Sequence, residues 1–78
     1  MIKKTLKHIV TFHTTSAAME MEDVCREKNA PGRLIPLPKR ISADCGLAWC
    51  SDIKESESVE RLLEETGIPF QGIHICEV

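Results

Sequence analysis

Short apolar runs alternate along the chain with longer segments in which apolar residues recur at helical spacing. Segment 7–13 is rich in β-branched and aromatic residues, which predicts a strand. From Ala17 to Lys28 apolar residues recur every three or four positions, which predicts a helix that ends at segment 29–32. Three hydroxyl residues precede this helix, and each can cap it by accepting a hydrogen bond from an unpaired backbone N–H: Thr14, Thr15 and Ser16.

The rest of the chain predicts three further strands and a second helix. The strands are expected over 33–37, 45–50 and 70–78. Pro36 and Pro38 donate no ladder hydrogen bond, so the first of these strands is expected at an edge of the sheet. The second helix has two potential caps in a polar lead-in, Asp52 and Ser56, and ends at Gly67, which suits a left-handed C-terminal position.

The predicted order is strand, helix, strand, strand, helix, strand, which favours the α+β class. Right-handed crossovers make the first two strands parallel and leave room for one strand between them. The compact arrangement with these properties is a ferredoxin-like split βαβ sandwich (βαββαβ), with antiparallel sheet order 4-1-3-2 and both helices on one face. Because 78 residues suffice for one core, we expect a single domain over 1–78 with a flexible N-terminus over 1–6.

The charge balance argues against a nucleic-acid partner. Ten Lys and Arg against twelve Asp and Glu give a net charge of −2 and a pI near 5.9, whereas phosphate binding favours a basic chain. No apolar run approaches the ~20 residues of a bilayer span, so no membrane partner is expected. Segment 1–4 resembles the start of an export signal, but polar residues interrupt the segment after it, so the cytoplasm is the expected location.

The main candidate for chemistry is Cys45. The predicted topology places the start of the third strand beside the end of the first, which brings Cys45 to segment 14–16, where the first helix begins. A helix N-terminus has unpaired N–H groups and a partial positive charge that favour the thiolate, the nucleophilic form of cysteine. A place on a polar connection between Asp44 and Gly46 indicates that Cys45 is not a core residue. The structural alternative is a small residue that merely fits the start of a strand.

Neighbouring residues are expected to support this thiol. Lys39 and Arg40 lie in the same connection and His13 ends the first strand, and a positive charge on each favours the thiolate. Gly46 has no side chain and so lets a bulky partner approach the sulfur. The basic residues also have a structural interpretation, because Lys and Arg protect edge strands from unwanted pairing.

The other three cysteines are expected to be free thiols with lesser roles. Cys25 lies on the apolar stripe of the first helix and is expected in the core. Cys50 is ~16 Å from Cys45 along an extended strand and faces the opposite side, so the two cannot form a disulfide. Cys76 is expected on the open face of the sheet. Four cysteines and three histidines are enough ligands for zinc, but without a C-x₂-C pair we expect no metal site and no cofactor.

Four segments, in matching order along most of the chain, resemble a known family. They are 12–19, 31–36, 38–48 with its Cys-Gly-Leu-Ala core, and 67–73, and the family is the selenium/sulfur carrier protein-like family of short bacterial and archaeal domains. The resemblance implies a carrier that holds sulfur or selenium as a persulfide or selenosulfide, and the family's cysteine falls on Cys45. One departure is Trp49-Cys50, where we expect an aliphatic residue and then a basic one.

We therefore expect a sulfur or selenium relay protein that acts as a carrier rather than as a turnover enzyme. Cys45 accepts sulfur from a cysteine desulfurase or another persulfide donor and passes it to an acceptor protein. The alternative is a non-catalytic regulatory or protein-interaction module that uses the open sheet face, with Trp49 either in the core or in that surface. So small a core also favours pairing of two copies into a homodimer through the open face.

Overall fold

The computed structural model describes residues 6–77, which contain four strands, two α-helices and one short 3-10 helix. In chain order they are β1 (Leu6–Thr11), α1 (Thr15–Lys28), β2 (Arg33–Pro36), β3 (Leu47–Asp52), η1 (Ile53–Glu55), α2 (Ser56–Thr66) and β4 (Gly72–Glu77). The N-terminus that is expected to be flexible spans residues 1–6. Residues 1–5 of it, which include the export-like segment 1–4, lie outside the described residues, and Leu6 is the first residue of β1. Neither α-helix of residues 6–77 has the length and apolarity needed to cross a bilayer.

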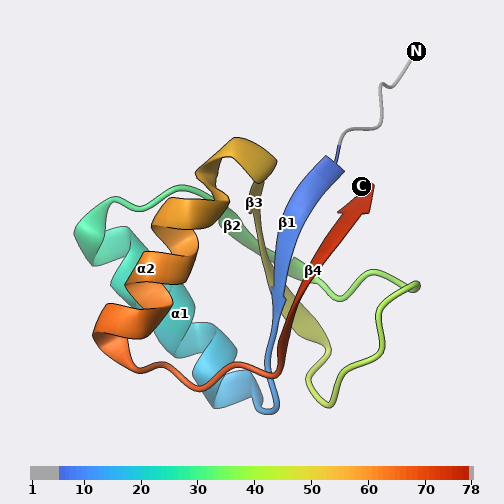
Figure 1. Cartoon of the computed structure of the whole chain (residues 1–78). Coiled ribbons are helices and arrows are strands. Elements are labelled where there is room, and N and C mark those ends of the chain that lie inside the picture. The colour runs from blue at the N-terminus through green and yellow to red at the C-terminus, as the bar shows by residue number, and fades with distance from the viewer. Residues whose placement is uncertain (1–5, 78) are drawn as a thin grey trace.

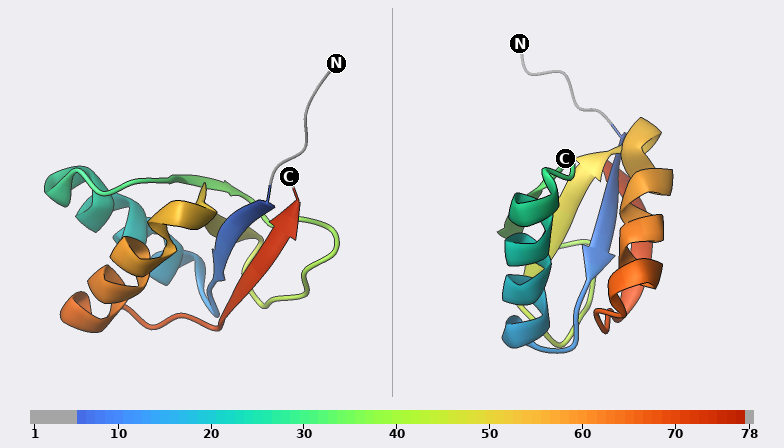
Figure 2. Two further views of the ribbon diagram at one scale, coloured as in Figure 1. Left: turned by 45° about the horizontal axis from the view of Figure 1, so that its top comes forward. Right: turned by 90° about the vertical axis from the view of Figure 1, so that its left-hand side faces the viewer.

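The four strands form one antiparallel sheet in the order β2-β3-β1-β4 (Figure 1). Read from the opposite edge, this is the predicted order 4-1-3-2. Both α1 and α2 cover the same face of the sheet, as two further views show (Figure 2). The predicted α+β class is therefore confirmed. β2 lies at an edge, as expected of a strand that ends at Pro36.

A side-chain hydrogen bond caps the first turn of α1, whereas α2 begins without one. Thr14 is the N-cap of α1, because its side-chain oxygen accepts a hydrogen bond from the backbone N–H of Ala17 at 3.2 Å. The prediction of a cap at Asp52 is wrong, because β3 extends to this residue and its carboxylate pairs with Lys7 across the sheet. Ser56, the other predicted cap, is instead the first residue of α2.

The main hydrophobic core fills the space between the helices and the sheet. Its buried members come from β1 and its end, α1, β3, α2 and the turns between them: Val10, Phe12, Ala17, Ala18, Met21, Cys25, Cys45, Trp49, Val59, Leu62, Leu63 and Ile68. The indole Nε1 of Trp49 donates a hydrogen bond to the carbonyl oxygen of Pro31 at 3.2 Å. Trp49 is therefore a core residue under the helices, and the alternative that places it in a surface on the open face is wrong.

A second, smaller core covers part of the sheet face opposite the helices, which was predicted to be open. Segment 37–46, which joins β2 to β3, runs along the side of the sheet away from the helices (Figure 1). Its Ile41 is buried against a cluster that contains Ile9, Ala48, Cys50 and Cys76. The middle of this face is therefore already occupied, which removes the central part of the surface that an interaction module or an open-face homodimer needs.

The connection between α1 and β2 passes close to Trp49 and Cys50 at Gly32, and a substitution there tests this contact. Gly32 has a φ of 112°, and a Cβ added there meets the indole nitrogen of Trp49 and lies 2.7 Å from the carbonyl oxygen of Cys50. We predict that Gly32→Ala lowers the free energy of unfolding by about 2–4 kcal/mol in urea denaturation, because it adds backbone strain to a steric clash. Gly46→Ala is the matched control, since a Cβ at Gly46 meets nothing within 4 Å. Equal effects of the two substitutions would contradict this account.

Candidate functional site

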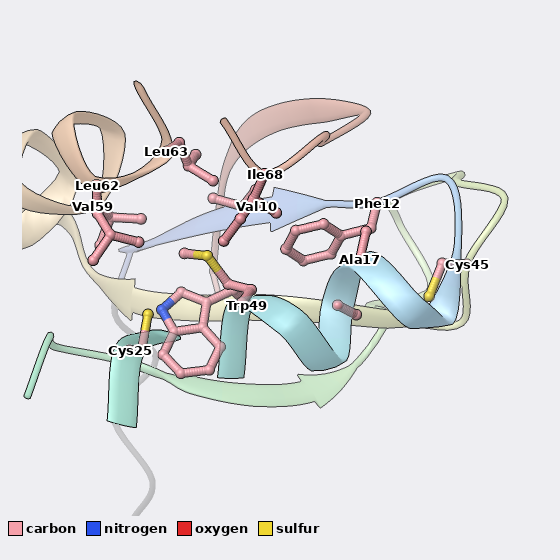
Figure 3. Packing of buried hydrophobic residues seen from close by; sticks show 12 residues of the cluster. Val10, Phe12, Ala17, Cys25, Cys45, Trp49, Val59, Leu62, Leu63 and Ile68 are labelled. Atoms are coloured by element: carbon pink, nitrogen blue, oxygen red, sulfur yellow. The ribbon is translucent and has the colours of Figure 1, made fainter. Parts of the chain in front are cut away.

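Cys45 lies in segment 37–46, two residues before β3 begins. Its backbone N–H donates a hydrogen bond to the carbonyl oxygen of Phe12 at 3.2 Å, which ties the segment to the end of β1. Figure 3 shows Cys45 at one end of the main core, where the chain enters α1. The structure thus brings Cys45 to the start of the first helix, as the topology predicts.

The Cys45 sulfur has two polar neighbours. The backbone N–H of Leu47 donates a hydrogen bond to Sγ at 3.4 Å. The thiol in turn donates to Thr15 Oγ1 at 3.8 Å, and Thr15 is the first residue of α1. An N–H donor stabilises a thiolate, and a hydroxyl group can reverse its role and donate to one. The positive end of the helix adds to the same preference. This arrangement suits a sulfur that carries negative charge.

The burial of Cys45 corrects one expectation. Only 3% of the residue is exposed, and it belongs to the main core together with Phe12 and Ala17. The expectation that Cys45 is not a core residue is wrong. The physical reason is that β3 begins at Leu47, so Cys45 is not the outer end of a strand but part of a turn. Its N–H bonds back to β1, and this bond directs the side chain inward.

The residues beside Cys45 pair with one another instead of with the thiol. His13 Nδ1 lies 3.0 Å from Asp44 Oδ2, and both side chains are more than half exposed. The backbone N–H of Asp44 donates to the side-chain oxygen of Gln71 at 3.0 Å. The sequence does not predict the contacts of Leu47 and Gln71, because no residue pattern indicates which atom a backbone N–H or an exposed amide side chain will bond. Together these bonds hold segment 44–46 against the ends of β1 and β4.

The other predicted supporting residues have different places. Lys39 and Arg40 lie in a turn closed by a bond from the Ile41 N–H to the Pro38 carbonyl oxygen at 3.0 Å. Among the described residues, no hydrogen bond or ion pair joins Lys39 or Arg40 to the thiol, and the same holds for Ser16, which is an exposed helix residue. Gly46 is exposed and leaves open space beside it, as expected.

The remaining cysteines are buried free thiols. Cys25 lies in the main core as predicted, and burial raises the pKa of its thiol to about 11. Cys50 and Cys76 lie in the second core, so Cys50 faces the opposite side of the sheet from Cys45, as predicted. Burial also raises the pKa of the Cys50 thiol, although the charges of Lys7 and Arg33 partly oppose this. Residues 6–77 contain no group of three His, Cys, Asp or Glu side chains that could hold a metal ion.

A comparison with protein families found one match. The family model described as Putative Se/S carrier protein-like matches residues 7–75, which is most of the chain. Comparisons with curated proteins and with solved structures found no significant match. The matched range includes Cys45, the helix start beside it and Cys50.

The raised pKa of Cys25 generates a prediction for alkylation of the native protein. At pH 8 a thiol with a pKa of about 11 is ionised to about one part in a thousand, roughly two hundredfold less than an ordinary thiol with a pKa of about 8.5. We expect iodoacetamide to leave Cys25 unmodified at pH 8 and to modify it faster as the pH rises toward 11. Peptide mapping by mass spectrometry gives the rate, and the urea-unfolded chain is the control. Native labelling as fast as in urea would contradict the assignment.

Proposed function

Since the chain belongs to the Se/S carrier protein-like family, we propose that it carries sulfur or selenium on Cys45 and passes the atom to an acceptor protein. The carried form is a persulfide or a selenosulfide. The donor is a cysteine desulfurase or another protein persulfide. In this proposal the protein takes part as a cargo-bearing partner rather than as an enzyme that turns over a substrate.

The observation that best supports this role is the hydrogen bond from the Leu47 N–H to the Cys45 sulfur at 3.4 Å. Backbone N–H groups are donors that no change of pH removes, and they favour an anionic sulfur over a neutral thiol. Thr15 places a hydroxyl group on the same sulfur at the positive end of α1. A persulfide is also an anionic sulfur group, so the same donors suit both the empty and the loaded cysteine.

Loading proceeds by ordinary thiol exchange. The Cys45 thiol loses its proton to solvent, and the thiolate forms a bond to the outer sulfur of the donor persulfide. The sulfur–sulfur bond of the donor breaks, and the donor cysteine leaves as a thiolate. Release to an acceptor thiolate is the same exchange in the opposite direction, so neither step needs an oxidant or a reductant.

The burial of Cys45 requires that a partner opens segment 44–46 before exchange. The contacts that close this segment are suited to opening, because the pair between His13 and Asp44 is exposed and such pairs contribute about 1 kcal/mol or less. In the closed form, the core shields the loaded sulfur from small thiols in solution. We place the carrier in the cytoplasm, where thiols stay reduced, and the four free cysteines are consistent with that location.

The proposal predicts which variants lose sulfur loading. The reduced protein is incubated with a cysteine desulfurase and cysteine, and we expect its intact mass to rise by one sulfur atom that peptide mapping assigns to Cys45. Cys45→Ser abolishes this gain. Thr15→Val slows it several-fold, because the hydroxyl that faces the sulfur is lost.

Two controls make the result specific. Ser16→Ala changes a neighbouring hydroxyl that has no contact to the sulfur among the described residues, so it loads at the wild-type rate. Thr15→Val unfolds at nearly the wild-type urea concentration, since Thr14, not Thr15, provides the cap of α1. Sulfur that still accumulates in Cys45→Ser to the wild-type level would remove Cys45 from the role.

A further inference from the structure

A pocket with a second thiol lies on the other face of the sheet, at the end far from the start of α1. Its volume is about 380 Å³, and it is formed by β2, β3, η1 and the first part of β1. Cys50 lies in its lining together with two cationic and two anionic side chains, which are Lys7, Arg33, Asp52 and Glu55. Cys45 lines neither this pocket nor the neighbouring one beside Trp49.

Strand register places the charges around the Cys50 sulfur. Arg33 of β2 is paired directly with Cys50 of β3, so the two side chains leave the same face about 5 Å apart at Cβ. Lys7 of β1 is paired with Asp52, two residues along β3 from Cys50, and therefore shares this face as well. Burial raises the pKa of the Cys50 thiol, and the positive charges of Lys7 and Arg33 partly oppose this.

Two of the four charged side chains form an ion pair with each other, and the other two have no ion pair among the described residues. Lys7 and Asp52 form an ion pair with each other, and the hydrogen bond from Lys7 holds the pKa of the Asp52 carboxyl below its usual value. The ion pairs of residues 6–77 include neither Arg33 nor Glu55. Within this described range, the pocket thus presents one free guanidinium, one free carboxylate and one thiol.

We propose that this pocket binds a zwitterionic amino-acid disulfide, of which cystine is the simplest example, and that Cys50 exchanges with it to form a mixed disulfide. Arg33 holds an α-carboxylate of the ligand, which a guanidinium can bind through two parallel hydrogen bonds. Glu55 faces an α-ammonium group of the ligand. A volume of about 380 Å³ lies within the ordinary range for small-molecule sites.

The exchange balances without any further reagent. The Cys50 thiolate forms a bond to one sulfur of cystine while the sulfur–sulfur bond of the ligand breaks. One cysteine leaves as a thiolate and takes up the proton that Cys50 gave to solvent. Burial keeps Cys50 largely protonated near neutral pH, so the exchange accelerates as the pH rises. The site does not depend on the proposed role of Cys45, which lies on the opposite face.

The test compares three small disulfides on the reduced full-length protein. L-cystine carries both an ammonium and a carboxylate on each half, cystamine carries only ammonium groups, and dithiodipropionate carries only carboxylates. We expect L-cystine to modify Cys50 about tenfold faster than either analogue, as measured by intact mass and peptide mapping. Arg33→Gln abolishes the preference over cystamine, whereas Arg40→Gln, which removes an exposed arginine outside this pocket, preserves it.

Peptide mapping of the wild-type protein locates the mixed disulfide even where a cysteine variant folds poorly. Cys50→Ser and Cys50→Ala both lose the modification, and Cys45→Ser keeps it. Equal rates for the three disulfides, or modification confined to other cysteines, would overturn the proposal. Sulfur loading of Cys45 by the desulfurase is measured separately in Cys50→Ser, so failure of one proposal is distinguishable from failure of the other.

Discussion

The structure depends on β1, a central strand of the sheet that is covered on both faces. Ile9, Val10, Thr11 and Phe12 are completely inaccessible, because the helices cover one side and segment 37–46 covers the other. β1 pairs with both β3 and β4 and so fixes the register of the sheet interior. Just beyond its end, the chain turns into α1, and the Phe12 carbonyl accepts the bond that holds Cys45. The position of the candidate thiol is therefore a direct consequence of how this strand is buried.

The element order and the strand order were predictable from the sequence, because they follow from periodicity, prolines and chain handedness. Gly67 adopts the left-handed conformation at the end of α2, with a φ of 70°, as predicted for a glycine at this position. The predictions that failed, for Asp52 and Cys45, depend on contacts between residues far apart in the sequence. Asp52 could cap a helix or pair with Lys7, and only the register of β1 with β3 decides in favour of the lysine. Ile41 sits among polar residues, so no periodicity identifies it as the residue that covers the second face.

Two cysteines five positions apart have environments that differ in kind. The Cys45 sulfur is surrounded by donors that belong to the fold itself, a backbone N–H and the first hydroxyl of a helix. The Cys50 sulfur instead lies beside long charged side chains at a pocket. Hydrogen-bond donors fixed by the fold suit a sulfur that stays in one position and one ionisation state. Charged side chains around a surface pocket instead suit the binding of a small charged molecule from solution. Cys45 packs in the main core and Cys50 in the second core on the opposite face of the sheet, so the two thiols cannot form a disulfide with each other.

Segment 37–46 is fastened at two points on opposite sides of the sheet, by Ile41 in the second core and by Cys45 in the main core. Complete release of this segment therefore exposes an isoleucine along with the sulfur, at a cost of roughly 2 kcal/mol for the isoleucine alone. A cost of that size limits the spontaneously released form to about one molecule in thirty. Under the proposed carrier role, a partner protein that binds the released form of this segment would make the sulfur accessible in a larger fraction of the molecules.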